Sequence, residues 1–132
     1  MSRIVVDTAT VEWDDATDGQ IKANVISLSS IGVPTELTIA SGAITVTGSY
    51  HIVDTESDAS TDDLATISGG VDGRVLVLRA ASSSRDVVVK DGSGNVQCAG
   101  DMTLDNVQDT ITLIYDATWT AWLEIARSSN GA

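Results

Sequence analysis

The stretch from Asp63 to Arg127 reads DLATISGGVDGRVLVLRAASSSRDVVVKDGSGNVQCAGDMTLDNVQDTITLIYDATWTAWLEIAR. Its apolar runs are four to seven residues long, and Gly, Ser, Asn or Asp ends each one before a helix could complete a second turn. In one run Leu76 and Leu78 alternate with Val75 and Val77, so a strand would place the two pairs on opposite faces. The stretch therefore predicts a succession of β-strands.

Further strands are expected on both sides of this run. Ile44 to Thr47 and Tyr50 to Val53 alternate around Gly48-Ser49, which predicts a hairpin. Thr110 to Asp116 and Trp119 to Arg127 form the last two predicted strands, while Glu36 to Ala40 fits either a strand or one helical turn. No repeated residue pattern indicates a solenoid or a propeller. We therefore expect an all-β protein, an antiparallel sandwich of the Greek-key or jelly-roll kind.

Several predicted strands carry apolar residues on both faces, as Val87 and Val89 against Val88 illustrate. A strand of this kind is usually covered on both sides. We expect the cover to be either the second sheet of a sandwich or another subunit.

Composition limits the partners. The chain has 132 residues, enough for one domain with a core, and 7 basic against 19 acidic residues give a formal charge of −12. That charge repels nucleic acid and anionic membrane surfaces, so neither is an expected partner.

No run is long and apolar enough for a signal peptide or a membrane span, and we expect synthesis in a cytoplasm. The single cysteine, Cys98, is expected to be a small buried hydrophobe.

Two regions are predicted. Residues 1–33 form an extended arm and a β-hairpin that turns at Asp14 to Gly19, and residues 34–132 form the β-sandwich module. The hairpin is too short to be stable alone, so we expect it to lie on another surface. Its candidate residues for capsid binding or subunit contact are the apolar ones: Ile4, Val5, Val6, Val11, Trp13 and Ile21.

The sequence contains no pattern typical of catalysis. His51 has no second imidazole nearby and is expected to be structural, and Gly69 to Gly73 lacks the Lys of a phosphate-binding loop. In the acidic loop Asp54 to Asp63, alternate acidic residues fit the start of a calcium loop, but Ala59 and Ala65 stand where Gly and Glu are needed, which favours a solvated loop. We assign no catalytic, cofactor-binding or metal-binding residue.

Trp119 and Trp122 are three residues apart, so a continuous strand would point them to opposite faces. One is then a core residue and the other is available to a partner. The alternative is that both tryptophans are core residues.

From Gly42 onward the chain resembles a β-module of bacteriophage virion proteins, namely head fibres, capsid decoration proteins and the tips of tail fibres. The resemblance covers residues 42 to 131 and lies in five segments: ITVTGSYHIVDTE (Ile44 to Glu56), DDLATISGG (Asp62 to Gly70), GRVLVLRAASSSRDVVVKDGSGN (Gly73 to Asn95), LDNVQDTITLIYD (Leu104 to Asp116) and WLEIARSSNGA (Trp122 to Ala132). The loop between Asp116 and Trp122 is longer than in the module, which would leave Trp119 at an exposed tip.

The resemblance implies a compact, commonly trimeric β-domain that works by adhesion and needs no cofactor. A tail fibre needs a shaft, whereas a decoration protein needs only a base and a knob, so we expect a homotrimeric decoration protein on the capsid exterior, bound to the major capsid protein. The alternative is the receptor-binding tip of a tail fibre or spike, in which Trp119 holds a glycan or protein of the host cell surface.

Overall fold

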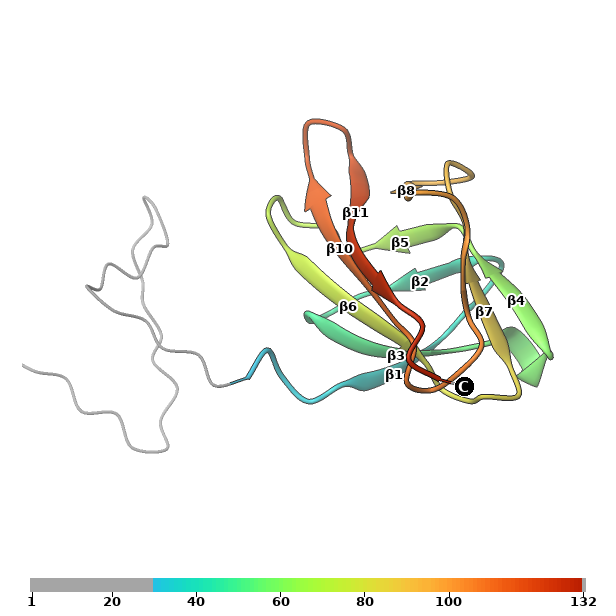
Figure 1. Ribbon diagram of the computed structural model, residues 1–132. Coiled ribbons are helices and arrows are strands. Elements are labelled where there is room, and N and C mark those ends of the chain that lie inside the picture. Colours follow the sequence, from blue (N-terminus) through green and yellow to red (C-terminus); the bar gives the residue numbers. More distant parts are fainter. Residues whose placement is uncertain (1–29, 132) are drawn as a thin grey trace, which may run out of the picture.

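In a computed structural model the chain forms a body built almost entirely of β-strands (Figure 1), and the structure describes residues 30–131. The predicted arm and hairpin, with all six of their candidate residues, lie outside the described part. The body contains eleven strands and one short 3₁₀ helix: β1 (Thr35–Thr38), β2 (Ala43–Thr45), β3 (Tyr50–Asp54), η1 (Glu56–Asp58), β4 (Thr61–Leu64), β5 (Thr66–Ser68), β6 (Val75–Ala80), β7 (Asp86–Val89), β8 (Val96–Gln97), β9 (Met102–Leu104), β10 (Thr110–Asp116) and β11 (Ala121–Ser128).

The strands form three sheets. The six-stranded sheet has the order β1-β3-β6-β10-β11-β8, the two-stranded sheet is β2-β5, and the three-stranded sheet is β4-β7-β9. The chain passes through the three sheets in turn as β2, β3 and β4, and then again as β5, β6 and β7, each strand parallel to its equivalent in the first pass. Such stacking of successive coils is solenoid-like.

The last strands depart from this parallel stacking. β9 is antiparallel to β7, and β10 is antiparallel to both β6 and β11. The β10–β11 hairpin rises above the rest of the body in Figure 1. The two stacked coils therefore continue into an antiparallel end.

The all-β prediction is confirmed, but the antiparallel sandwich is wrong. Five of the eight strand pairs are parallel, and three sheets surround the core in place of two facing sheets. The expectation that the chain is no solenoid is wrong for the same reason. Ala43 pairs with Thr66 and Thr61 with Asp86, so the coil repeats at about 25 residues. Among the paired residues of the two coils only Ile44 and Ile67 are identical, which leaves no repeated residue pattern.

The hairpin predicted around Gly48-Ser49 is also wrong, because this turn is a corner between two sheets. β2 belongs to the two-stranded sheet and β3 to the six-stranded sheet. The buried His51 holds the corner: its Nε2 accepts the N–H groups of Thr47 at 3.2 Å and Gly48 at 3.1 Å. Its Nδ1 lies 2.9 Å from Oγ1 of Thr35, in β1. His51 therefore links two strands and their corner, which agrees with its predicted structural role.

Other local predictions agree with the structure. The segment left open at Glu36 to Ala40 contains strand β1, parallel to β3. The last two predicted strands are β10 and β11, paired antiparallel, although β11 begins two residues later than expected, at Ala121.

The core lies between the three sheets and is aliphatic. Leu76 and Leu78 of β6 face inward beside their partners on β10, Leu113 and Ile111, and all four are fully buried. Burial of each such side chain stabilises the fold by about 1.5–3 kcal/mol. Seventeen buried residues form the cluster: Ile39, Ile44, Val46, Val53, Leu64, Ile67, Leu76, Leu78, Ala80, Val87, Val89, Val96, Met102, Leu104, Ile111, Leu113 and Trp122.

A side chain ends the two-stranded sheet. Asn95 Oδ1 accepts the N–H of Ile67 in β5 at 2.9 Å, and Asn95 Nδ2 donates to the Ile67 carbonyl at 2.8 Å. The amide thus makes the two bonds that a neighbouring strand residue would make. The preceding Gly94 permits this approach, because a Cβ there would collide with the carbonyl group of Ala65.

Candidate functional site

The most distinctive surface is the outer face of the six-stranded sheet. Leu76 and Leu78 point into the core, so their neighbours Val75 and Val77 point outward, and the same alternation turns Ile114 outward on β10. Strand pairing places Val75, Ile114 and Leu123 side by side in one row across β6, β10 and β11. Tyr50, Val77, Thr112 and Ala126 form the next row.

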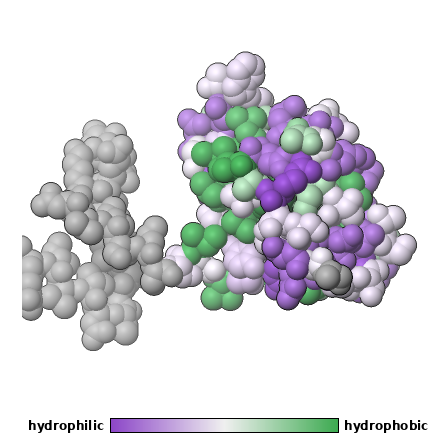
Figure 2. Space-filling view, in the orientation of Figure 1, coloured by the Kyte–Doolittle hydropathy of each residue, from purple (hydrophilic) through white to green (hydrophobic). Residues whose placement is uncertain are grey.

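We call these seven residues the outer rows, and none of them is charged. Val75 is 41% exposed, and Ile125, at the irregularity of the β10–β11 pairing, is 56% exposed. Figure 2 shows apolar side chains gathered on the flank of the body formed by β6 and the adjoining end of β10. A contiguous apolar surface of this kind is typical of a contact with another molecule.

Charged residues lie beyond both ends of the outer rows. Glu36, Ile52 and Arg79 are in register across β1, β3 and β6 at one end, and Asp116 ends β10 at the other. The surface therefore has an uncharged centre and a charged rim, which is the common arrangement of protein interfaces.

The tip of the β10–β11 hairpin carries the second exposed feature. Trp119 lies in the turn before β11 and is 71% exposed, as expected from the length of this loop. Beside it, Gln97, Ala121 and Leu123 complete the lining of a shallow pocket of about 230 Å³. An exposed indole ring beside a pocket can stack on a flat or apolar group of a ligand.

Trp122, in contrast, is fully buried within β11. Its Nε1 donates to the Ile67 carbonyl at 2.9 Å, and its ring meets that of Tyr115 edge to face, with centroids 5.2 Å apart. The prediction that one of the two tryptophans is core and the other accessible agrees with these positions. The reason differs, because Trp119 lies in a turn and not on the opposite face of a strand.

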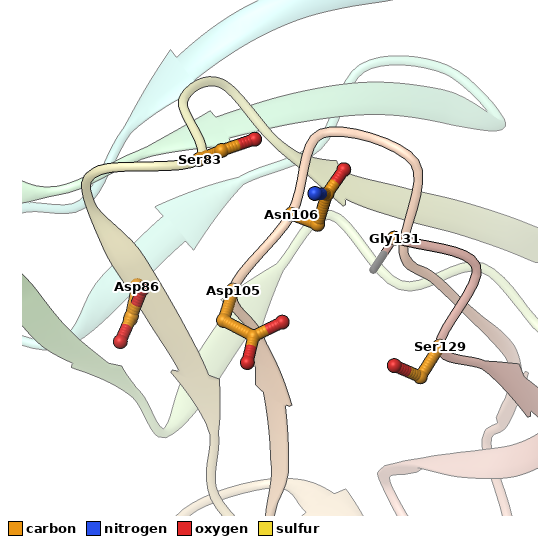
Figure 3. A pocket seen from close by; sticks show the side chains of 6 residues that line it. All are labelled: Ser83, Asp86, Asp105, Asn106, Ser129 and Gly131. Atoms are coloured by element: carbon orange, nitrogen blue, oxygen red, sulfur yellow. The ribbon is translucent and has the colours of Figure 1, made fainter.

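A polar pocket of about 490 Å³ lies at another part of the surface (Figure 3). Asp105 and Asp86 line it together with Ser83, Asn106, Ser129 and Gly131. Behind Asp105 lies Asp109, which is fully buried and whose Oδ1 accepts the N–H groups of Asn130 at 2.7 Å and Gly131 at 3.1 Å. Asp109 thus attaches the end of the described chain to the loop before β10.

The carboxyl groups of Asp105 and Asp109 interact directly. With both ionised, Asp109 Oδ2 is buried without a donor. A proton on Asp105 would supply the missing hydrogen bond. That bond, with desolvation, raises the pKa of Asp105. Burial raises the pKa of Asp109, but hydrogen bonds from Gly131, Asp105 and Asn130 outweigh it and lower the pKa. Sequence analysis missed this pair, because spacing alone does not show that two loop carboxylates meet.

The acidic loop after β3 is held by hydrogen bonds and ion pairs. Arg85 donates through Nε and Nη2 to the two carboxylate oxygens of Asp54 at 2.7 and 2.9 Å, and these bonds hold the pKa of Asp54 below its ordinary value against the effect of burial. Glu56 accepts the N–H of Ser41. Within residues 30–131 no three His, Cys, Asp or Glu side chains are arranged to hold a metal ion. The alternate acidic residues of this loop therefore do not point toward one common position, as the ligands of a metal ion would.

Cys98 packs against the core but is only partly buried, and is thus less buried than expected. Desolvation, together with the negative charge of Glu124, raises the pKa of its thiol to about 11. Glu124 itself is paired with Arg127, which lowers the pKa of Glu124.

Comparison of the chain with protein-family models, with curated proteins and with solved structures finds no match. The resemblance to virion β-modules therefore remains a prediction. In residues 30–131 there is no helix that is long and apolar enough to cross a membrane. The surfaces of the β-body are therefore the features that bear on function.

Proposed function

We propose that this chain is a non-enzymatic structural protein of a bacteriophage virion, a homotrimeric decoration protein of the capsid exterior. Its N-terminal region, residues 1–33, binds the major capsid protein, and the β-body is the outward part. The observation that carries the proposal is the set of uncharged outer rows at the centre of the six-stranded sheet, on a protein with a formal charge of −12. Such a face supports a protein that functions by contact with other proteins.

The form of the body supports the same function. A stack of β-coils around an aliphatic core gives a rigid knob whose strands are joined by many short connections. The β10–β11 hairpin projects from the rest of the knob (Figure 1), which suits a displayed tip.

Co-sedimentation tests this function. The full chain is mixed with heads of the encoding phage that lack decoration, and bound protein is measured after centrifugation. Two variants each remove one tryptophan: Trp13→Ala alters the proposed attachment region, and Trp119→Ala alters the hairpin tip. We expect the first to lose capsid binding and the second to keep it. Absence of binding by the unaltered chain would reject the proposal.

The exposed Trp119 and its pocket favour a second candidate, the receptor-binding tip of a tail fibre or spike. This function predicts that the isolated protein binds host cells and that Trp119→Ala abolishes the binding, whereas Trp13→Ala does not. Binding to capsids and not to cells would select decoration.

A further inference from the structure

We infer that the outer face of the six-stranded sheet is the contact between copies of this chain. The inference rests on the proposed homotrimer and identifies the surface through which it assembles.

The two faces of the six-stranded sheet differ. Its inner face is covered by the core, whereas Val75 and Ala126 of the outer rows are exposed and the other five residues are partly exposed. Two of the four strands that carry the outer rows, β3 and β6, are parallel to each other, and parallel strands are generally buried on both faces. Val75, Ile114 and Leu123 are the residue types expected on a covered face, since solvated faces of sheets carry polar side chains.

Charge selects a second copy as the occupant. A chain with a formal charge of −12 repels its own copies, so association is least costly through a surface that brings no carboxylates of the two copies together. The outer rows are such a place, since they hold seven uncharged residues. A basic partner would find no carboxylate among them to pair with.

The rim supports the same occupant. Arg79 takes part in none of the ion pairs formed within residues 30–131, although it lies beside the outer rows. Carboxylates of the same surface, Glu36 and Asp116, border the rows as well. A neighbouring copy therefore brings both signs of charge to the rim while the centre stays uncharged, which suits an interface between identical chains.

Two threonines provide a matched test. Thr112 lies in the middle of the outer rows, and Thr103 points outward from β9 in the three-stranded sheet, paired with Val88. Thr112→Arg and Thr103→Arg make the same change of charge and size at outward strand positions. Analytical ultracentrifugation of the full chain at micromolar concentration measures the assembly, and circular dichroism confirms folding.

We expect the unaltered protein and Thr103→Arg to sediment as trimers. Thr112→Arg should weaken association by about tenfold or more, because it places an unpaired charge in the contact. Thr112→Val keeps the β-branched shape, removes a hydroxyl, and should lower the concentration at which trimers form. Trimers that are equally stable in Thr112→Arg and Thr103→Arg, or unaffected by Thr112→Val, would overturn the inference.

Capsid binding separates this inference from the proposed function. If the protein is trimeric and binds capsids but the Thr112 variants assemble normally, only the assigned face is wrong. If the unaltered protein is a monomer, both the face and the homotrimer are rejected.

Discussion

Asp105 and Asp109 show how two carboxyl groups with opposite pKa shifts affect stability. The raised pKa of Asp105 contributes stability below its unfolded-state pKa, and this contribution is lost as pH rises through the folded-state value. The lowered pKa of Asp109 contributes stability above its unfolded-state pKa, which is lost as pH falls through the folded-state value. At neutral pH the ionised Asp105 is therefore the unfavourable member of the pair.

Replacement of Asp105 by asparagine should stabilise the protein at neutral pH. The amide of Asp105→Asn can donate to Asp109 Oδ2, which lacks a donor when both groups are ionised, and it removes the repulsion. The gain in melting temperature should shrink as pH falls into the range where Asp105 carries a proton. Asp63→Asn, which removes one charge at an exposed position, is the control. A gain of the same size in both variants would show that the effect is one of net charge.

Cys98 should react slowly with thiol reagents in the folded protein. With a thiol pKa of about 11, far less thiolate is present near pH 8 than in a free cysteine. We expect alkylation by iodoacetamide to be on the order of a hundredfold slower in the native protein than in guanidinium-unfolded protein at the same pH. Equal rates in the two states would contradict the burial of this thiol.

Among the elements, β5 depends on a single side chain at its edge. Asn95 supplies the acceptor for the N–H of buried Ile67, whereas the Ile67 carbonyl also receives Nε1–H of Trp122. Asn95→Ala should therefore leave one buried N–H unpaired and lower the free energy of unfolding by about 1–3 kcal/mol. Denaturant titration measures this loss. Asn106→Ala, which removes one exposed hydrogen bond, should have a much smaller effect.

The strands were predictable from the sequence, but their partners were not. Alternation around Leu76 and Leu78 identifies β6, and alternation is the same whether a strand pairs parallel or antiparallel. Gly48-Ser49 permits either a hairpin or a corner. The buried His51 stabilises the corner, because it binds the N–H groups of Thr47 and Gly48 there and also contacts Thr35. Thr35 is distant from His51 in sequence, so this contact could not be predicted from the local pattern.

The candidate site was predictable to a similar extent. Apolar residues on both faces of several strands are visible in the sequence, and Val75 and Val77 of the outer rows are among them. The continuity of the outer rows depends on which strands are neighbours, so it could not be read from alternation. The exposure of Trp119 was predictable, because the loop that carries it is local.

At the scale of the whole molecule, the proposed trimer has to overcome the charge repulsion between its copies. Three copies with a formal charge of −12 each carry −36 together. The uncharged outer rows keep carboxylates out of the contact, but the rest of each surface still repels the other copies. Salt shortens the range of the remaining repulsion, since the screening length falls from about 30 Å at about 0.01 M to about 8 Å at about 0.15 M. The trimer should therefore become more stable as salt, or a divalent cation, is added.

Sedimentation and thermal melting at these two ionic strengths measure that change. We expect the dissociation constant of the trimer to fall and its melting temperature to rise with salt. Thr112→Arg, measured at a concentration where it sediments as a monomer, reports the effect of screening within one chain. If salt raises the melting temperature of this variant by as much as that of the unaltered protein, the repulsion that salt relieves lies within each copy. Only a larger gain in the unaltered protein shows that salt acts between copies, because the repulsion between subunits exists only in the trimer.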